Sequence, residues 1–439
     1  VTLMIALGLI RWLAPGLLGG PADLQLVQLD EKMPAYYRGI FREADLSSGE
    51  FLLKDPLTRV RARPLYPRYR DLGPHDILGF RNSGVPVVAD IVTIGDSMTY
   101  GNNATLEQNW PSYMAANLKH EHPNVYNMST GGWAAVQYLD MFGYALAFRP
   151  RVAIIAFYSG NDPLETFQLV YGNEHWHSLI PDDSLSADDI PAVSGAGASG
   201  DQWDVVFRGG VHTVFTPRYR LASNDDDSTV TAGYRIMAEV AARIGELAQS
   251  NGVKTIFTII PTKELVYAAR VDAEGLEAPA DYNRLVTSER QRIAGLREKL
   301  EALPGTRYVD LLGPLQAAAL GETSLYPDTV NGHPVAAGYE IIGRQLAQVV
   351  AELLPAPPSG LYALMDDDSF YVLLVNREGV WYFNSMELIE ANGWPPEELQ
   401  TIGLRDILDL PHRGAVDAVD PARFGPASCL PVETTLSRQ

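Results

Sequence analysis

The sequence predicts an α/β protein, a three-layer α/β/α sandwich in which a mainly parallel sheet of about five strands lies between two layers of helices. Short β-branched runs alternate with helical periods between residues 89 and 354. This alternation is typical of parallel strands joined by crossover helices. The run 151–157 is continuously apolar after its first residue, as expected for a strand that is buried on both faces.

The elements follow one another in a regular order. Strands are expected at 90–94, 124–127, 151–157, 253–260 and 307–311. Helices are expected between and after them, where apolar residues recur at helical spacing. They cover 110–118, 134–148, 233–250, 283–302 and 334–354. The main domain therefore spans 86–354.

Two segments precede this domain. Residues 1–20 are almost wholly apolar, which predicts a membrane anchor or the remnant of a signal peptide. Arg11 interrupts the run, so a buried or interfacial helix is the alternative. Residues 21–85 are rich in Pro, Arg and Tyr, and we expect them to wrap the domain as irregular chain. An anchor or signal would place the protein outside the cytoplasm, tethered to a membrane of the cell envelope or secreted.

Two further segments break the alternation. Residues 165–230 carry Asp pairs, Ser, Gly and Pro, which indicates a long irregular insertion over the active face of the sheet. A Pro-rich linker begins at Pro355, and a small C-terminal α+β unit is expected at 361–439. In that unit a hairpin is predicted, with strands at 370–375 and 380–384. We expect an accessory unit, although it faintly resembles the first half of a PAS sensor domain.

Composition restricts the partners. The formal net charge is −20, which opposes binding to nucleic acid because affinity for phosphate backbones comes from clustered Lys and Arg. Cys429 is the single cysteine, so the chain has no internal disulfide, and cysteine usage does not decide the compartment.

Four segments at the ends of predicted strands, or just before the last helix, carry groups that can do chemistry. Gly95-Asp96-Ser97 follows the first strand, and ligand sites in open parallel sheets lie at such ends. Gly132 follows the second, where a glycine lets the backbone N–H approach a reacting carbonyl. Asn161 follows the third and can donate to an oxyanion. His333 precedes the final helix and can act as a base. Taken singly, each segment has a structural reading: a turn, a helix cap or a structural histidine.

Together, in this order, the four segments resemble the conserved blocks of the SGNH (GDSL) hydrolase superfamily over about residues 75–354. The resemblance implies a flavodoxin-like plan, Ser97 as nucleophile and His333 as general base. It also implies an oxyanion hole made by the Ser97 and Gly132 backbone N–H groups and the Asn161 side chain. The segments Leu78-Gly79-Phe80-Arg81-Asn82 and Pro261-Thr262-Lys263-Glu264 resemble bacterial, often membrane-anchored members, some of which have relatives in polysaccharide O-acetylation.

The chain departs from this pattern in two places. Ser159 stands where a glycine is usual, two residues before Asn161. The acid of the family lies two or three residues before the histidine, and here those positions hold Asn331 and Val330. Asp328, five residues upstream of His333, is the nearest carboxylate. We therefore expect that Asp328 orients His333, the alternative being a Ser/His dyad.

The resemblance implies hydrolysis of an acyl or acetyl ester, on a small molecule or a carbohydrate, through an acyl-enzyme on Ser97. Two alternatives remain: an O-acyltransferase that works with a membrane partner, and a catalytically weak binding or scaffold protein. No cofactor is expected. His175 and His177 alternate beside Asp182 and Asp183, but a third ligand at zinc spacing is not evident, so we expect no metal.

Overall fold

The computed structural model describes residues 50–429, except 70, 119–123, 191–199, 355–358 and a few single or paired positions after 366. The predicted anchor at 1–20 and the first part of the wrapping segment lie outside the described residues. The chain divides into two compact units, Val1–Leu354 and Pro355–Gln439, and each is described by itself.

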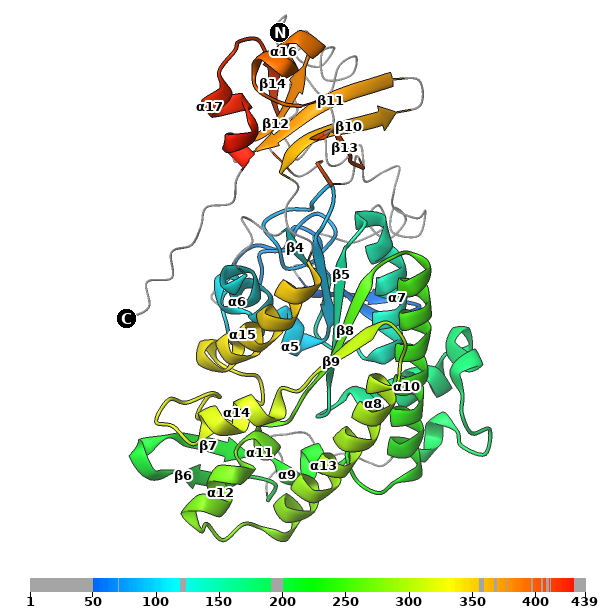
Figure 1. Cartoon of the computed structure of the whole chain (residues 1–439). Coiled ribbons are helices and arrows are strands. Elements are labelled where there is room, and N and C mark those ends of the chain that lie inside the picture. The colour runs from blue at the N-terminus through cyan, green and yellow to red at the C-terminus, as the bar shows by residue number, and fades with distance from the viewer. Residues whose placement is uncertain are drawn as a thin grey trace, which may run out of the picture. The chain divides into compact units, whose positions relative to one another are not determined.

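The first unit is built on a five-stranded sheet in the order β4-β3-β5-β8-β9 (Figure 1). All its neighbouring strands pair in parallel. The predicted strands are confirmed to within one or two residues: β3 (Ile91–Gly95), β4 (Val125–Asn127), β5 (Val152–Tyr158), β8 (Lys254–Ile260) and β9 (Thr306–Val309). The strand order reverses at β3, between its neighbours β4 and β5, and an open parallel sheet binds ligands beyond the carboxyl ends of strands at such a switch point.

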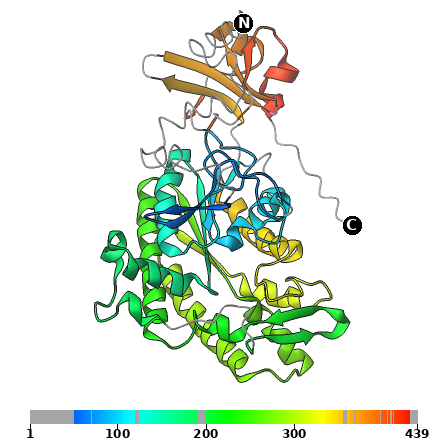
Figure 2. The same ribbon diagram turned by 180° about the vertical axis from the view of Figure 1, so that it is seen from behind.

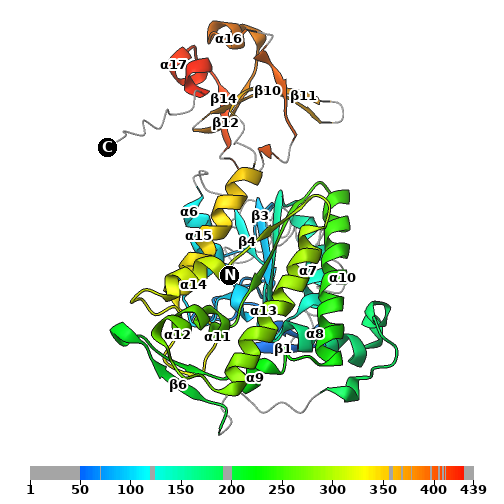
Figure 3. The same cartoon turned by 60° about the horizontal axis from the view of Figure 1, so that its bottom comes forward.

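Helices cover both faces of the sheet, which confirms the three-layer α/β/α class. α7 (Ala135–Ala145) and α10 (Ser228–Ser250) lie on one side, and α6 (Trp110–Asn117) and α15 (Ala336–Leu353) on the other (Figure 3). Successive residues of β5 alternate between the two cores, Ile155 belonging to one and Ile154 to the other, as the period of two of a strand requires. Among the described residues of this unit, the other α-helices are α5 (Ser97–Tyr100), α8 (Asp162–Gly172), α9 (Pro217–Leu221), α11 (Lys263–Val266), α12 (Ala268–Glu274), α13 (Ala280–Glu301) and α14 (Leu312–Ala319).

The expected irregular insertion at 165–230 has more structure than predicted. It contains most of α8, a hairpin of β6 (Trp203–Val206) and β7 (His212–Phe215), and then α9. α8 begins at Asp162 with Pro163 in its first turn, where proline is well tolerated because the N–H that it lacks has no partner inside the helix. The expectation was wrong because a local abundance of Gly, Pro and Asp does not exclude short helices and strands.

The wrapping segment also contains a hairpin that was not predicted. β1 (Leu52–Asp55) pairs antiparallel with β2 (Arg59–Ala62), and Figure 2 shows this hairpin in dark blue. Among the described residues, no helix combines the length and apolarity needed to cross a membrane.

The C-terminal unit holds a five-stranded sheet in the order β13-β10-β11-β12-β14. The predicted hairpin is present as β11 (Ser369–Asn376) and β12 (Gly379–Phe383), which pair antiparallel. Its described residues also form β10 (Gly360–Asp366), β13 (Gln400–Thr401), β14 (His412–Val416), α16 (Met386–Ala391) and α17 (Pro421–Phe424). Trp381, Trp394 and Phe424 lie in its own apolar core.

Candidate active site

Ser97 lies at the carboxyl end of β3, at the switch point of the sheet. Asp96 caps the short helix α5 by accepting a hydrogen bond from the backbone N–H of Met98 at 2.8 Å. A Cβ on Gly95 would lie 2.1 Å from Oγ1 of Thr99, so only glycine fits before the turn. The Gly-Asp-Ser triplet thus fixes both the turn and the position of the Ser97 hydroxyl.

His333 meets Ser97 from the loop before α15. Its Nε2 lies 2.7 Å from the Ser97 Oγ, the geometry of a base paired with a nucleophile. Lys263 holds this loop, because its Nζ donates to the carbonyl oxygens of Thr329 at 2.8 Å and Asn331 at 3.2 Å. The structure therefore brings together the two residues predicted as nucleophile and base.

The third group of the constellation is Asn331. Its Oδ1 lies 2.7 Å from Nδ1 of His333 and also accepts from the backbone N–H of His333 at 3.1 Å. The Asn331 Nδ2 donates to Oδ1 of Asn103 at 2.9 Å, which turns the amide oxygen toward the imidazole. With Nδ1 carrying the proton, Nε2 is left free to accept one from Ser97.

Asp328 does not occupy this position, so the expectation that it orients His333 is corrected. Its side chain lines a separate pocket of about 410 Å³, together with His212 and Glu322. The turn closed by Asn331 places the residue two before the histidine, not five before it, against Nδ1. This spacing is the one at which the family carries its acid, but the residue there is an amide, which gives no charge signal in the sequence.

The Gly131–Gly132 turn runs beside the nucleophile. A Cβ on Gly131 would lie 3.7 Å from Cβ of Ser97, and Gly132 has a φ of +78°, a left-handed conformation that favours glycine. Asn161 directly follows β5 and precedes α8, and its side chain makes no capping bond to that helix. Its buried Oδ1 has no hydrogen-bond partner among the described residues. The Asn161 side chain thus does not cap α8, and it forms a hydrogen bond with Glu165. The oxyanion role of its NH2 group stays a prediction.

Comparison with known proteins identifies the family. Residues 93–341, more than half of the chain, match the model of the GDSL-like lipase/acylhydrolase family. The chain belongs to this family. It is therefore a hydrolase acting on ester bonds, as the sequence predicted.

The chain is also similar to solved structures of low sequence identity. A GDSL-like lipase from Bacteroides thetaiotaomicron is 13% identical, with a TM-score of 0.32, over 60% of this chain and 88% of that one. An extracellular lipase from Streptomyces rimosus is 13% identical, with a TM-score of 0.32, over 60% of this chain and all of that one (100%). No curated protein sequence matches the chain.

The electrostatics of this GDSL-family site keep its base neutral. Burial lowers the pKa of His333 to about 3, and the charge of Arg220 adds to the effect. Arg220 is itself buried; its Nη1 lies 3.4 Å from the Gly160 carbonyl oxygen, and a Cβ on Gly332 would lie 2.6 Å from its Nη2. A neutral imidazole can accept a proton, but the imidazolium that forms receives no opposite charge from the Asn331 amide.

Three buried or largely buried carboxyl groups lie near the nucleophile in this GDSL-family enzyme. Burial raises the pKa of Asp96 to about 7 and that of Asp162 well above its usual value. The charge of Glu165 adds to both shifts, and the charge of Asp96 adds to that of Asp162. The Asp162 Oδ2 accepts from the Tyr138 hydroxyl and the Tyr158 backbone N–H, both at 2.9 Å. These two hydrogen bonds to the Asp162 carboxylate thus fix the start of α8.

Ser159, the residue that replaces a usual family glycine, has a structural partner. Its Oγ donates to Oε1 of Glu289 at 2.5 Å, and Glu289 also accepts from the Thr262 N–H at 2.8 Å and hydroxyl at 2.6 Å. These bonds join the ends of β5 and β8 beside the site. The departure from the family pattern therefore ties the active-site edge of the sheet together.

The alternating histidines of the sequence lie in the segment that follows α8. His175 and His177 lie on a short 3₁₀ turn (Glu174–Leu179), where both side chains are exposed. Within the described part of the chain, His, Cys, Asp and Glu do not form a group of three or more that could hold a metal ion. The alternating histidines therefore supply no evidence for a metal centre.

Proposed function

We propose that this protein hydrolyses a small acyl or acetyl ester through an acyl-enzyme on Ser97. The observation that carries the proposal is the position of His333. Its Nε2 lies 2.7 Å from the Ser97 Oγ, and its Nδ1 lies 2.7 Å from the Asn331 Oδ1. A nucleophile, a base and a group that orients the base are the parts that acyl transfer needs.

In the first half of the reaction, the Ser97 Oγ attacks the ester carbonyl carbon while its proton moves to Nε2 of His333. The carbonyl oxygen becomes an oxyanion, for which we assign the backbone N–H groups of Ser97 and Gly132 and the Asn161 amide as donors. One such donor contributes about 3 to 4 kcal/mol of transition-state stabilisation. His333 then returns the proton to the leaving alcohol, and the acyl group remains on Ser97.

In the second half, water attacks the acyl-enzyme and gives its proton to His333. Collapse of the second tetrahedral intermediate releases the acid and returns the proton to Ser97. Asn331 holds the neutral imidazole in one tautomer and keeps the ring oriented when it is protonated, as the third member of a Cys-His-Asn site does. This complete alignment favours a working enzyme over a catalytically weak scaffold protein.

The experiment measures hydrolysis of p-nitrophenyl acetate by the wild type and by Ser97→Ala and His333→Ala. We expect both variants to lose nearly all turnover, and the wild type to show an acetylated active-site peptide in mass spectra of a quenched reaction. Ser112→Ala is the matched control, because its hydroxyl bonds to the Leu106 carbonyl oxygen within the fold. Wild-type turnover in Ser97→Ala would contradict the proposal. Product that forms only with an added oligosaccharide acceptor would indicate the transferase.

A further inference from the structure

A pocket of about 770 Å³ lies between the β1–β2 hairpin and α8. Its volume is within the range of about 300 to 1,000 Å³ that is typical of ligand sites. The pocket is lined by Lys54, Asp55, Pro56, Arg59, Val60, Gln168, Leu169, Gly172 and Asn173. The mechanism above uses none of these residues.

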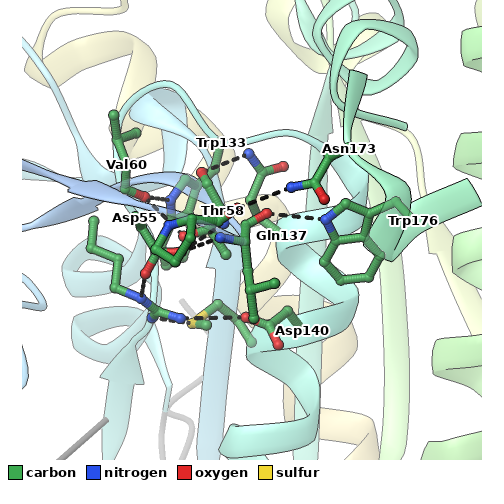
Figure 4. A network of polar contacts seen from close by, with 12 residues as sticks. Asp55, Thr58, Val60, Trp133, Gln137, Asp140, Asn173 and Trp176 are labelled. Atoms are coloured by element: carbon green, nitrogen blue, oxygen red, sulfur yellow. Dashed lines mark hydrogen bonds and ion pairs between the residues drawn. The ribbon is translucent and has the colours of Figure 1, made fainter. Parts of the chain in front are cut away.

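The hairpin wall of this pocket is fixed in place. Trp133 Nε1 donates to the Val60 carbonyl oxygen at 2.7 Å, and Trp176 Nε1 donates to that of Leu57 at 3.0 Å. Gln137 Nε2 donates to the carbonyl oxygen of Thr58 at 3.2 Å. Figure 4 shows Trp133, just before α7, Gln137 in α7 and Trp176 in the turn after α8 reaching the hairpin. The pocket is therefore preformed, which lowers the entropic cost of binding.

Arg59 connects the pocket with the active site. Its Nη2 lies 3.3 Å from the carbonyl oxygen of Gly132 and 3.5 Å from Oε2 of Glu165. A Cβ on Gly132 would lie 3.7 Å from Cγ2 of Val60, another lining residue. The pocket thus adjoins the turn that passes beside Ser97, and a substrate of sufficient length can occupy both.

The charge of the pocket is opposite to that of the protein. Lys54 is exposed, and its side chain forms no ion pair with any described residue. The Arg59 side chain is 47% exposed and has one carboxylate near it, Glu165. Asp55 does not offset these charges, because it is buried and binds the N–H groups of Leu57 and Thr58 and the guanidinium of Arg61. Two exposed cationic residues thus line one pocket of a chain whose net charge is −20, and one of them, Arg59, lies near Glu165.

We propose that this pocket binds the anionic part of the substrate, a carboxylate-bearing oligosaccharide that carries the ester. Lys54 and Arg59 would hold the carboxylate, and Gln168, whose amide has no hydrogen bond within the described residues, would bind sugar hydroxyls. The Gly131–Gly132 turn separates the pocket from Ser97, so the ligand must extend beyond a single small ester. This inference rests on the proposed ester hydrolysis and names its substrate class.

The test compares two O-acetylated substrates, an oligogalacturonate, which is polyanionic, and a xylo-oligosaccharide, which is neutral. We expect the wild type to prefer the anionic substrate in kcat/KM, and added NaCl to weaken that preference because salt screens exposed charges. Lys54→Glu should lower the ratio of the two kcat/KM values at least tenfold, mainly through KM for the anionic substrate. Lys54 makes no side-chain hydrogen bond or ion pair within the described chain, so this variant should fold.

Arg68→Gln is the matched control, because Arg68 is an exposed cation of the same N-terminal segment that pairs with Glu107 outside the pocket. It should leave the ratio unchanged. Equal effects of Lys54→Glu on both substrates, or an equal change of the ratio in Arg68→Gln, would overturn the inference. So would a wild type that cleaves neither substrate. Ser97-dependent hydrolysis of p-nitrophenyl acetate reports separately on the proposed function.

Discussion

The amide oxygen of Asn331 lies 2.7 Å from Nδ1 of His333, in the place where a carboxylate is expected. The contact orients the imidazole but adds no negative charge. His333 is also buried near Arg220, and together these two factors lower its pKa to about 3. The site therefore combines correct geometry with a base that resists taking up a proton.

The variant Asn331→Asp should raise the activity. A carboxylate at this position stabilises the imidazolium, and each tenfold change in proton affinity corresponds to about 1.4 kcal/mol. We expect kcat for p-nitrophenyl acetate to rise roughly tenfold at pH 7 to 8. Asn331→Ala should lower it roughly tenfold to a hundredfold, because the tautomer is no longer held.

Asp328→Asn is the control for these variants. Because Asp328 lines the separate pocket with His212 and Glu322, its neutralisation should leave kcat and KM at wild-type values. A loss of turnover in Asp328→Asn that matches the loss in Asn331→Ala would contradict the assignment of Asn331.

The sequence was sufficient to predict the sheet, because each of its strands is a local apolar or β-branched run. β5 is the clearest case, since all seven of its residues are buried. It was also sufficient for Ser97 and His333, whose surroundings have a recognisable residue pattern. Asn331 was missed for a chemical reason: an amide can fix the tautomer of a histidine as a carboxylate does, and we searched for charge alone.

The hairpin that forms one wall of the pocket could not be predicted in the same way. Its second strand, Arg59–Ala62, alternates basic and apolar residues over four positions only. Trp133 and Trp176 stabilise the hairpin through bonds to Val60 and Leu57, which are 73 and 119 positions away in sequence. Long-range contacts of this kind leave no local periodicity.

Removal of the Arg220 charge should shift the pH profile. A neutral His333 is required for attack by Ser97, so activity on the acidic side falls as pH drops through the pKa of His333, which is about 3. Arg220→Met should raise that pKa and move the acidic limb of kcat/KM to higher pH. The measurement is a pH–rate profile, with the His333 ring signal followed by NMR. Arg243→Met is the control, because its guanidinium pairs with Glu239 on the surface of α10. An unchanged acidic limb in Arg220→Met would contradict the electrostatic role.

Asp96 should make stability depend on pH in the opposite sense to an ordinary carboxylate. Its pKa is raised to about 7 in the folded protein, first by burial, while an unfolded Asp titrates at about 3.9. A raised pKa gives a contribution that is complete below the unfolded value and is lost as pH rises through the folded value. The loss therefore falls between about pH 4 and pH 7, and amounts to at most about 4 kcal/mol.

The variant Asp96→Asn tests this contribution because it removes the charge and keeps an oxygen for the Met98 N–H. We expect the Tm difference between the variant and the wild type to become more favourable to the variant from pH 5 to pH 8.5, as measured by calorimetry. Asp183→Asn is the control, since its side chain is exposed and forms no ion pair with the described residues. A difference that stays constant across this pH range would exclude Asp96 as the titrating group.

Glycine at position 95 should be required for steric reasons that do not apply at Gly143. A Cβ there would lie 2.1 Å from the Thr99 Oγ1 and 2.9 Å from the Ala156 carbonyl oxygen, so the end of β3 would have to shift, and Ser97 with it. Gly95→Ala should lower stability by about 2 kcal/mol or more and abolish turnover.

Gly143→Ala is the matched substitution in α7, where a Cβ would meet nothing within 4 Å. It should raise stability by about 0.5 to 1 kcal/mol, because alanine favours a helix interior, and leave turnover unchanged. Chemical denaturation of both variants separates the two cases, and similar losses in both would show that the close packing of Gly95 is not what the turn requires.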